Sequence, residues 1–526
     1  MITAITLENF KGISAPVTIP LRPLTIMFGK NSAGKSTVVQ ALHYAREILL
    51  RDNLNADRTM RGGAAVDLGG FRNLVNNHDE TKAIKMSFEI DLSKTDLPEY
   101  NFSETILYKL NRTPMPEDSD SEISQEIDND FLRWVDELSG RTSSIIVELK
   151  IEWSEILEYP VLTSYKTLFN KVEAVQILTS ADGKDVQIKY NAHHPLLSDP
   201  LLSVEEDSKQ ENSGFGWKTI EVSGYEKTLP EKGQVLILNE ENFRFHREID
   251  SIRLTQMLVA PADLLREQLD LFRYLGPLRA TPPRSFQPAL SEDESDWANG
   301  LAAWRELYTD KSFAELWVSG EGLSRLKTGY RFELNEYREI PLESDLMFAL
   351  ENNTVFDDIA DTGEEIRKFP KKKKLVLVEE KSGLEIAPHD IGVGISQVVP
   401  VIVAAFSSEP RMIAIEQPEL HLHPAVQAEL GDLFIDCALG NFKNFFLLET
   451  HSEHLILRVL RRIRECSEGE MENSNSPQIK PDDVQLIYVE PAKGGTVFYN
   501  LPVTKEGDFA ENVPGGFFAE RAKELF

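Results

Sequence analysis

The stretch GKNSAGKS at residues 29–36 constrains the fold more than any other part of the chain. It satisfies the pattern G-x-x-x-x-G-K-[ST], with the apolar run LTIMF before it and the helical pattern TVVQALHYAREILL after it. Glycines let such a loop curl until its N–H groups face phosphate oxygens, while the lysine adds positive charge and the serine hydroxyl can ligate magnesium. An α/β fold that binds ATP or GTP with Mg²⁺ is therefore predicted, and the alternative of an ordinary glycine turn is disfavoured.

The predicted nucleotide ligands are consecutive, and they are Gly29, Lys30, Asn31, Ser32, Ala33, Gly34, Lys35, Ser36 and Thr37. Ser36 is also a predicted magnesium ligand, because a serine or threonine follows the lysine in this pattern.

Length and charge limit what surrounds this loop. A chain of 526 residues exceeds the size of one growing core, so two or three domains, or one domain with a large insertion, are expected. Its 56 basic and 86 acidic side chains give a net charge of −30, which disfavours general coating of DNA.

Cys437 and Cys466 allow at most one disulfide and argue against structural zinc. Without a secretory start or an apolar run of membrane length, a cytoplasmic protein is expected.

Hydrophobic patterning divides the chain into four segments. Residues 1–84 alternate strand and helix around the phosphate loop, and residues 85–250 predict a β-rich, mainly antiparallel insertion with two acidic flexible loops. Residues 251–383 are helical and mixed, with RLTQMLVAPADLLREQLDLFRYL as the clearest helical run, and residues 384–526 return to an α/β pattern. The core is therefore expected to be split between the two ends of the chain.

A second cluster, DIGVGISQ at residues 390–397, places glycines and a serine at the start of a helix. The N–H groups at a helix start favour an anion, so Gly392, Gly394, Ser396 and Gln397 are predicted to contact phosphate. The alternative is an ordinary helix start that Ser396 or Asp390 caps.

Two buried strands end in polar residues. IAIEQPELHLHP contains Glu416, Gln417 and Glu419, and LLETHSEHL carries His451 at the end of the following strand. Histidine can donate from either ring nitrogen, so His451 is predicted to touch a γ-phosphate or an attacking water, although a lone histidine is more often structural. Glu416, Gln417, Glu419 and His451 are therefore the candidate site residues at these two strand ends. His421 and His423 are interpreted as loop residues, because no third metal ligand accompanies them.

These motifs, together with ITLENFKG, resemble the ABC-type head of the SMC, RecF and OLD ATPases. They are more similar to bacterial OLD-like ATPases of the AAA class in anti-phage systems such as Septu and PARIS, and YLGPLRATPPR and PGGFFAERAKELF also resemble segments of that group. The implied fold is an ABC-type P-loop ATPase head split between N- and C-terminal segments, 1–84 and 384–526, with a β-rich plus helical insertion. The second segment would carry the signature, the Walker B strand and the switch histidine.

The resemblance also implies a homo-oligomer. Two heads would form at least a dimer around two ATP molecules, and each site would combine one subunit's phosphate loop with the other's signature serine, Ser396. DLGGFRNLV at residues 67–75 lies where such heads place a loop that links the γ-phosphate to the adjoining lobe, unless it is a plain glycine turn.

One residue departs from the pattern of many relatives, whose strand ends Asp-Glu-Pro. In those relatives the first acid holds magnesium and the second polarises the attacking water. The resemblance therefore implies that Glu416 is a magnesium ligand and that the catalytic residues come from Glu416, Gln417, Glu419 and His451. Gln417 stands in the second acidic place, and glutamine can orient water but cannot accept its proton. Three alternatives follow. Glu416 both holds magnesium and activates the attacking water, or Glu419 or His451 activates the water, or turnover is slow and the closed state is long-lived. We expect genuine but slow hydrolysis.

No Toprim nuclease domain, such as the OLD nucleases carry, is recognisable in the 75 residues after His451. The chain is therefore expected to be an ATPase sensor or scaffold that controls a separate effector, a nuclease, with a phage-encoded protein as its trigger. The alternative is an ATP-gated DNA clamp in repair or recombination, using KKKK at 371–374 and RVLRRIRE at 458–465. Those runs could equally be a solvated hairpin edge and an exposed helix face. A nuclease in its own right is the third alternative.

Overall fold

The computed structural model describes residues 1–59, 62–93, 95–100, 134, 138, 140–197, 216–220, 222, 225–236, 246–284, 286, 294–351, 359–470, 476–511 and 513. Both acidic stretches, most of QVLILNEENFRF and the closing PGGFFAERAKELF lie outside these residues. The chain divides into two compact units. Unit 1 comprises 1–272, 482–502 and 509–526, and unit 2 comprises 273–481 and 503–508.

Unit 1 contains an eight-stranded sheet in the order β11-β10-β9-β8-β7-β6-β1-β2, in which every neighbouring pair is antiparallel. Its strands are β1 (Ile2–Glu8), β2 (Val17–Pro20), β6 (Ile84–Asp91), β7 (Ser144–Ser154), β8 (Tyr159–Phe169), β9 (Val172–Thr179), β10 (Val186–Asn191) and β11 (Trp217–Ile220). Alternate residues of β6 are buried, as a sheet with one covered face requires. Because β6 lies beside β1, this sheet crosses the boundary expected at residue 84.

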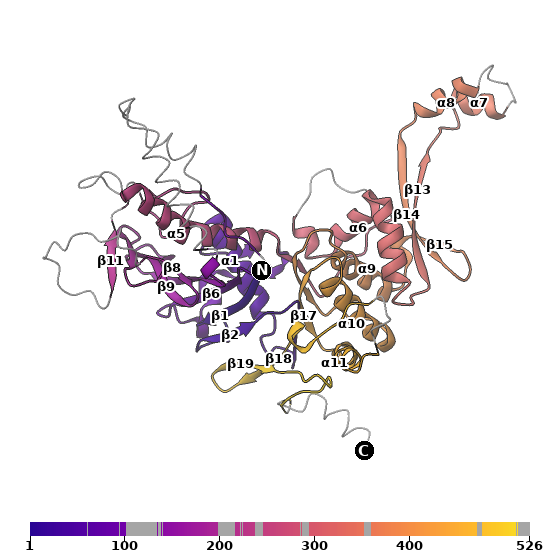
Figure 1. The fold of residues 1–526 in the computed structure, drawn as a ribbon. Coiled ribbons are helices and arrows are strands. Elements are labelled where there is room, and N and C mark those ends of the chain that lie inside the picture. Colours follow the sequence, from indigo (N-terminus) through magenta and orange to yellow (C-terminus); the bar gives the residue numbers. More distant parts are fainter. Residues whose placement is uncertain are drawn as a thin grey trace. The chain divides into compact units, whose positions relative to one another are not determined.

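One long helix, α5 (His246–Asp270), packs against this sheet (Figure 1). Tyr165 and Thr167 on β8 donate hydrogen bonds of 2.7 and 2.9 Å to the backbone carbonyls of Leu258 and Met257. The helix also contacts α1 (Thr37–Arg51), where Arg266 donates to the carbonyl of Leu49 at 2.8 Å. The buried face of the sheet is thus tied to the helix that follows the phosphate loop.

The strand before the phosphate loop, β3 (Leu24–Gly29), is buried along its whole length. It runs parallel to β18 (Val484–Ala492), which forms an antiparallel hairpin with β19 (Gly495–Leu501). Residues from the two ends of the chain therefore form one layer of unit 1. The expected α/β fold, with a core split between N- and C-terminal segments, is confirmed.

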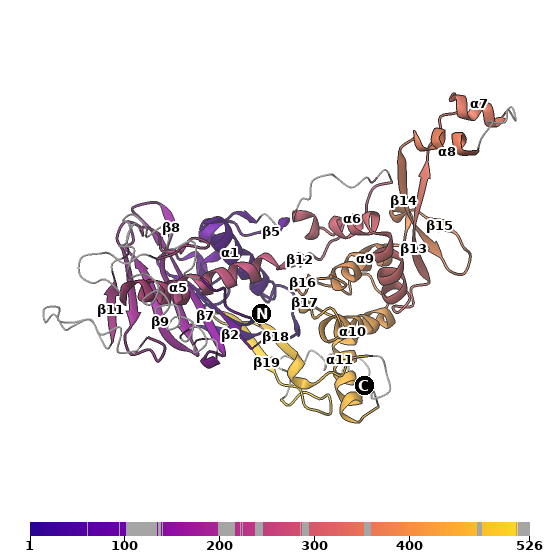
Figure 2. The same ribbon diagram turned by 45° about the horizontal axis from the view of Figure 1, so that its top comes forward.

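Unit 2 is built on three parallel strands, β12 (Arg273–Leu275), β16 (Met412–Glu416) and β17 (Phe445–Thr450). The predicted helix over 253–275 is wrong at its end, because α5 stops at Asp270 and Arg273–Leu275 pair with β16. Helices α9 (Val393–Ala405) and α10 (Pro424–Leu439) pack on these strands (Figure 2). Helix α6 (Leu301–Thr309) and a π-helix over Phe313–Leu323 pack on α9, and α11 (Glu453–Ser467) packs on α10.

A long hairpin projects from unit 2, formed by β13 (Tyr330–Arg338) and β14 (Lys371–Glu379), with β15 (Glu385–Ile386) beside β14. The short helices α7 (Asp345–Glu351) and α8 (Ile359–Arg367) lie at its far end (Figures 1 and 2). No helix in the described parts of either unit is long and apolar enough to cross a membrane.

Candidate nucleotide-binding site

The phosphate loop of unit 1 needs its two glycines. Gly29 has φ +144°, and a Cβ there would lie 2.1 Å from the carbonyl oxygen of Val489 in β18. Gly34 has φ +94°, and its Cβ would lie 2.8 Å from Oγ1 of Thr496. Residues with side chains rarely adopt these conformations, and they would collide with neighbouring atoms in this space. Both positions of the loop therefore require glycine.

Lys35 is buried, with 3% of its surface exposed, and its Nζ donates to the carbonyls of Gly29 at 3.2 Å and Lys30 at 2.9 Å. Its ammonium group is thus held against the loop's own backbone, which keeps a positive charge at the loop. Ser36 is the N-cap residue of α1, and the N–H of Thr37 donates to the carbonyl of Gly34 at 3.1 Å.

The other predicted ligands of the loop differ in exposure. Lys30, Asn31 and Ser32 are exposed, and Ser32 has a left-handed backbone with φ +58°. Ala33 is buried, and Lys30 lies 3.8 Å from Glu490 of β18. The exposed residues therefore form the outer rim of the loop.

Thr496 was not foreseen beside this loop. Its N–H donates to the carbonyl of Gly12 at 2.7 Å, and a Cβ on Gly12 would meet its Oγ1 at 2.4 Å. The hairpin turn before it holds Gly494 and Gly495, both with positive φ. This adjacent glycine pair was the local signal of a tight turn, but nothing local placed the turn against Gly34.

The segment 67–75 adopts a glycine turn. Gly69 and Gly70 have φ of +68° and +75°, and they begin the short helix α2 (Gly70–Leu74). The carbonyl of Leu74 accepts the N–H of Lys11 at 2.6 Å. The segment therefore contacts the ITLENFKG motif of the same unit.

The acidic strand end lies in unit 2, where β16 ends at Glu416. Its Oε1 accepts a hydrogen bond from the hydroxyl of Tyr274 at 2.9 Å. Burial, together with the charge of Glu416, raises the pKa of Tyr274, so this phenol stays protonated and donates. Gln417 follows with φ +46°, and its N–H donates to the carbonyl of Glu449 on β17 at 2.7 Å. A left-handed residue at this point turns the chain sharply out of the sheet.

Glu419 and His451 are brought together. Oε1 of Glu419 accepts the backbone N–H of His451 at 2.7 Å, while its Oε2 has no hydrogen-bond partner among the described residues. Burial raises the pKa of Glu419 even though the N–H of His451 opposes that shift. This carboxyl therefore fixes the backbone at the end of β17 from inside the unit.

Helix α9, which contains the predicted phosphate contacts of residues 390–397, begins at Val393 with Gly392 as its N-cap residue, so neither Ser396 nor Asp390 caps it. A Cβ on Gly394 would lie 2.9 Å from the carbonyl of His421, so this turn of α9 approaches the loop after β16 closely. Ser396 is buried and its hydroxyl donates to the carbonyl of Val393 at 2.9 Å. Gln397 is also buried and bonds to Arg279.

Arg279 is the second residue that sequence reasoning missed. It lies in the loop after β12, is 4% exposed, and donates to the backbone carbonyls of Glu416 at 2.6 Å and Gln417 at 3.2 Å. Burial lowers its pKa to about 10, so it remains charged at neutral pH. Its place in YLGPLRATPPR was noticed, but an arginine between prolines gives no local sign of what it contacts.

The histidines between β16 and α10 are loop residues. His421 is exposed with φ +62°, and Nδ1 of His423 accepts the N–H of Ala425 at 3.3 Å, which caps α10. Within the described ranges, no group of three His, Cys, Asp or Glu side chains is arranged to hold a metal ion. Cys437 and Cys466 are both free thiols.

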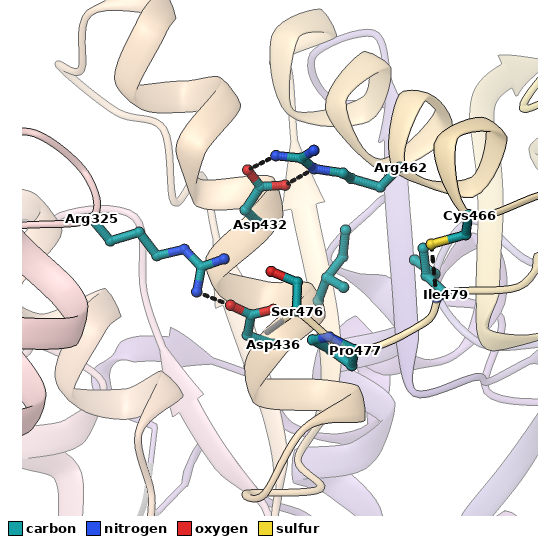
Figure 3. Close-up of a pocket in the computed structure, with 9 residues that line it drawn as sticks. Arg325, Asp432, Asp436, Arg462, Cys466, Ser476, Pro477 and Ile479 are labelled. Carbon is teal, nitrogen blue, oxygen red and sulfur yellow. Dashed lines mark hydrogen bonds and ion pairs between the residues drawn. The ribbon is translucent and has the colours of Figure 1, made fainter. Parts of the chain in front are cut away.

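Three arginines of the basic run 458–465, Arg458, Arg461 and Arg462, form ion pairs with acidic side chains, while Arg461 and Arg464 are also exposed. Figure 3 shows a small pocket of unit 2 in which Arg462 forms a bidentate pair with Asp432, and Arg325 contacts Asp436. Arg458 also donates to Asp432, at 2.5 Å. The pocket contains none of the predicted site residues.

Three of the four lysines of 371–374 form ion pairs. They lie in β14, and Lys371, Lys372 and Lys374 pair with Glu336, Glu339 and Glu385. Lys373 instead donates to the backbone carbonyl of Thr309 at 3.2 Å.

Comparison with known proteins identifies the sequence family. The model for the family described as "AAA ATPase domain" matches residues 1–213 and 322–456. No curated protein sequence matches significantly.

Among solved structures, an Smc head bound to the C-terminal winged-helix domain of ScpA covers 96% of this chain and 98% of its own, with 10% identity and a TM-score of 0.38. The Smc head of Pyrococcus furiosus bound to a ScpA domain covers 100% and 98%, with 10% identity and a TM-score of 0.37. The SMC head of Thermotoga maritima covers 95% and 99%, with 8% identity and a TM-score of 0.34. These TM-scores are low, so the family assignment depends on the match to the AAA ATPase domain model and not on the structural similarity.

Proposed function

The chain belongs to the AAA ATPase domain family, and on that premise we propose that it is a slow, nucleotide-gated ATPase of the ABC type that works as a dimer in the cytoplasm. Its ATP state would control a separate effector protein, a nuclease, in anti-phage defence, with a phage-encoded protein as trigger. The observation that carries the ATP-binding part is the phosphate loop, in which left-handed glycines and the inward-held Lys35 form a cradle for phosphate.

The residues fit ATP with Mg²⁺. The loop N–H groups and Lys35 would hold the β- and γ-phosphates, and Ser36 would be a ligand of the metal. When bound, magnesium neutralises charge on the phosphate oxygens. Tyr274 holds Glu416 in one orientation, and Gln417 is suited to orienting a water molecule for attack on the γ-phosphate.

Two contacts support slow turnover. The carboxylate of Glu416 already accepts a hydrogen bond from Tyr274, and Gln417 cannot remove a proton from water. Glu419 fixes the backbone of His451 and lies buried. A long-lived ATP state suits a switch that waits for a partner protein. A motor that cycles continuously would need a general base that removes the proton from the attacking water.

Charge favours a protein partner over DNA. The net charge is −30, and the basic runs at 371–374 and 458–465 are largely paired with glutamate and aspartate side chains. An ATP-gated DNA clamp would need exposed, unpaired cations to contact phosphates. The DNA clamp is therefore the less favoured proposal.

The central experiment measures ATP turnover and solution mass for the wild type, Lys35→Ala and Glu416→Ala. Lys311→Ala is the matched control, because this lysine is 57% exposed and its ion pair is with Glu315, four residues further along the chain. We expect slow turnover and an ATP-dependent doubling of mass in the wild type and the control, with turnover lost in both site variants. Equal turnover in the wild type and Lys35→Ala would refute the proposal.

The effector is tested by purifying the tagged chain from its native cells with ATP and Mg²⁺, beside Lys35→Ala. We expect a second polypeptide whose metal-dependent nuclease activity changes when ATP is removed or when Lys35 is replaced. A chain that purifies alone in both nucleotide states would count against effector control, while leaving the ATPase assignment intact.

A further inference from the structure

We propose that the β18–β19 hairpin holds the phosphate loop in the shape that binds ATP, and that Thr496 is the positioning residue of this contact. The inference deepens the ATP-binding part of the proposed function and rests on it. The hairpin and the phosphate loop both belong to unit 1. Thr496 acts through the loop, so it is not a catalytic residue.

The first contact between hairpin and loop lies where the loop begins. Val489 of β18 pairs in parallel with Gly29, and a Cβ on Gly29 would lie 2.1 Å from the carbonyl oxygen of Val489. One residue further along each chain segment, Lys30 and Glu490 form an ion pair of 3.8 Å. Because the side chain of Lys30 is 59% exposed, this pair contributes little, and the close packing of the two backbones is the main contact.

The second contact lies where the loop ends. Thr496 of β19 packs on Gly34, the residue before Lys35. A Cβ on Gly34 would lie 2.8 Å from Oγ1 and 3.2 Å from Cγ2 of Thr496. The side chain of Thr496 therefore occupies the space that a side chain at residue 34 would take. The hairpin thus contacts the phosphate loop at both its first and its last glycine.

Thr496 is itself held in place from the opposite side. Its N–H donates to the carbonyl of Gly12 at 2.7 Å, and a Cβ on Gly12 would lie 2.4 Å from its Oγ1. The backbone of Gly495 also lies against Gly12, because a Cβ on Gly495 would lie 2.2 Å from the same carbonyl oxygen. The side chain of Thr496 therefore lies between Gly12 and Gly34, and its Oγ1 is the atom nearest to the Cβ position of each.

A glycine loop that is already held in shape binds its ligand more tightly. Gly34 has φ +94°, and glycine loses more conformational freedom on ordering than any other residue. Ordering the backbone of one residue corresponds to about a tenfold change in an equilibrium constant. Contact with Thr496 would supply this order before ATP arrives, so that the nucleotide does not have to impose it.

The experiment measures the Kd for ATP with Mg²⁺ by isothermal titration calorimetry, together with kcat and KM. Thr496→Ala removes both atoms that face Gly34, so it should weaken ATP binding by about tenfold while kcat at saturating ATP is unchanged. Thr496→Ser keeps Oγ1, the atom nearest to both glycines, and should bind ATP as the wild type does.

The matched control is Thr179→Ala. Thr179 of β9 is half-buried, as Thr496 is, and its hydroxyl contacts that of Thr228. Three strands separate β9 from β1, the strand that leads to Gly12. This control should leave the Kd for ATP unchanged. Thermal unfolding of both alanine variants without nucleotide measures any general loss of stability, which a positioning role does not require.

A second variant tests the contact from the side of Gly12. Gly12→Ala adds a methyl group where Oγ1 of Thr496 lies, so it should displace that side chain and weaken ATP binding. Combined with Thr496→Ala, the added methyl group has space and lies where the hydroxyl was. The double variant should therefore bind ATP more tightly than Gly12→Ala alone, which is a non-additive result typical of residues in contact.

The outcomes separate the inference from the proposed function. A Thr496→Ala variant that binds ATP as tightly as the wild type overturns the inference and leaves the ATPase proposal intact. Equal losses of affinity in Thr496→Ser and Thr496→Ala, or a fall in kcat with an unchanged Kd, would also overturn it. A wild type that binds ATP no better than Lys35→Ala overturns the proposed function, and the inference fails with it.

Discussion

At the scale of single residues, Gln417 sets the expected rate of the reaction. It occupies the second acidic place of the strand end, and its backbone is fixed by Glu449 on one side and Arg279 on the other. Gln417→Glu keeps the length of the side chain and supplies a base. We expect ATP turnover to rise by about 100-fold, the lower end of what a positioned base contributes.

The measurement is kcat for ATP, with Gln417→Asn as the control that shortens the amide without adding a base. Asparagine also tolerates a left-handed backbone, so this control should fold and stay slow. An unchanged kcat in Gln417→Glu would mean that proton removal does not limit turnover.

Glu419 predicts a dependence of stability on pH. Its folded-state pKa is raised, chiefly by burial, above its ordinary value of 4.5. Such a group stabilises the fold fully below its unfolded pKa, and this contribution is lost as pH rises through the folded pKa. Glu419→Gln removes the titration, so its thermal midpoint relative to the wild type should be higher at about pH 8 than at about pH 5. A thermal-midpoint difference between Glu419→Gln and the wild type that does not change with pH would contradict the raised pKa of Glu419.

At the scale of elements, the packing of α10 against α11 depends on one buried carboxylate. Burial alone would raise the pKa of Asp432, but Arg462 and Arg458 lower it, so the group is ionised at neutral pH. Asp432→Ala leaves both arginines without this partner and should lower the free energy of unfolding by about 3 kcal/mol. This is the lower end of the range for a buried pair, because the side chain of Arg462 is 25% exposed.

The measurement is urea-induced unfolding near neutral pH. Arg461→Ala is the control, because Arg461 is 58% exposed in its pair with Glu465, and its loss should cost less than about 1 kcal/mol. Equal effects of the two substitutions would show that Asp432 does not organise the contact between these helices.

At the scale of the whole molecule, the charge of −30 decides between a protein partner and DNA. A protein that neutralises DNA phosphates loses affinity with salt at a logarithmic slope of about −0.9 per contact. We expect no ATP-dependent binding of duplex DNA and therefore no measurable slope. A steep slope seen only with ATP, and lost in Lys35→Ala, would instead support the clamp.

What the sequence alone could predict was local. The phosphate loop between a strand and a helix was recognisable because its glycines, lysine and serine are adjacent in the chain. The two buried strands that end in polar residues, Met412–Glu416 and Phe445–Thr450, were also predicted, since continuous apolar runs are properties of short segments.

Only the tertiary structure decided which distant residues meet. Arg273–Leu275 looked helical but form a strand, because pairing with β16 outweighs local preference. Thr496 reaches Gly34 and Arg279 reaches Glu416 across long stretches of chain, and neither contact leaves a trace in the neighbouring residues. The sequence by itself determined an α/β protein with a phosphate loop, whereas long-range strand pairing and burial decided which residues surround its predicted catalytic groups.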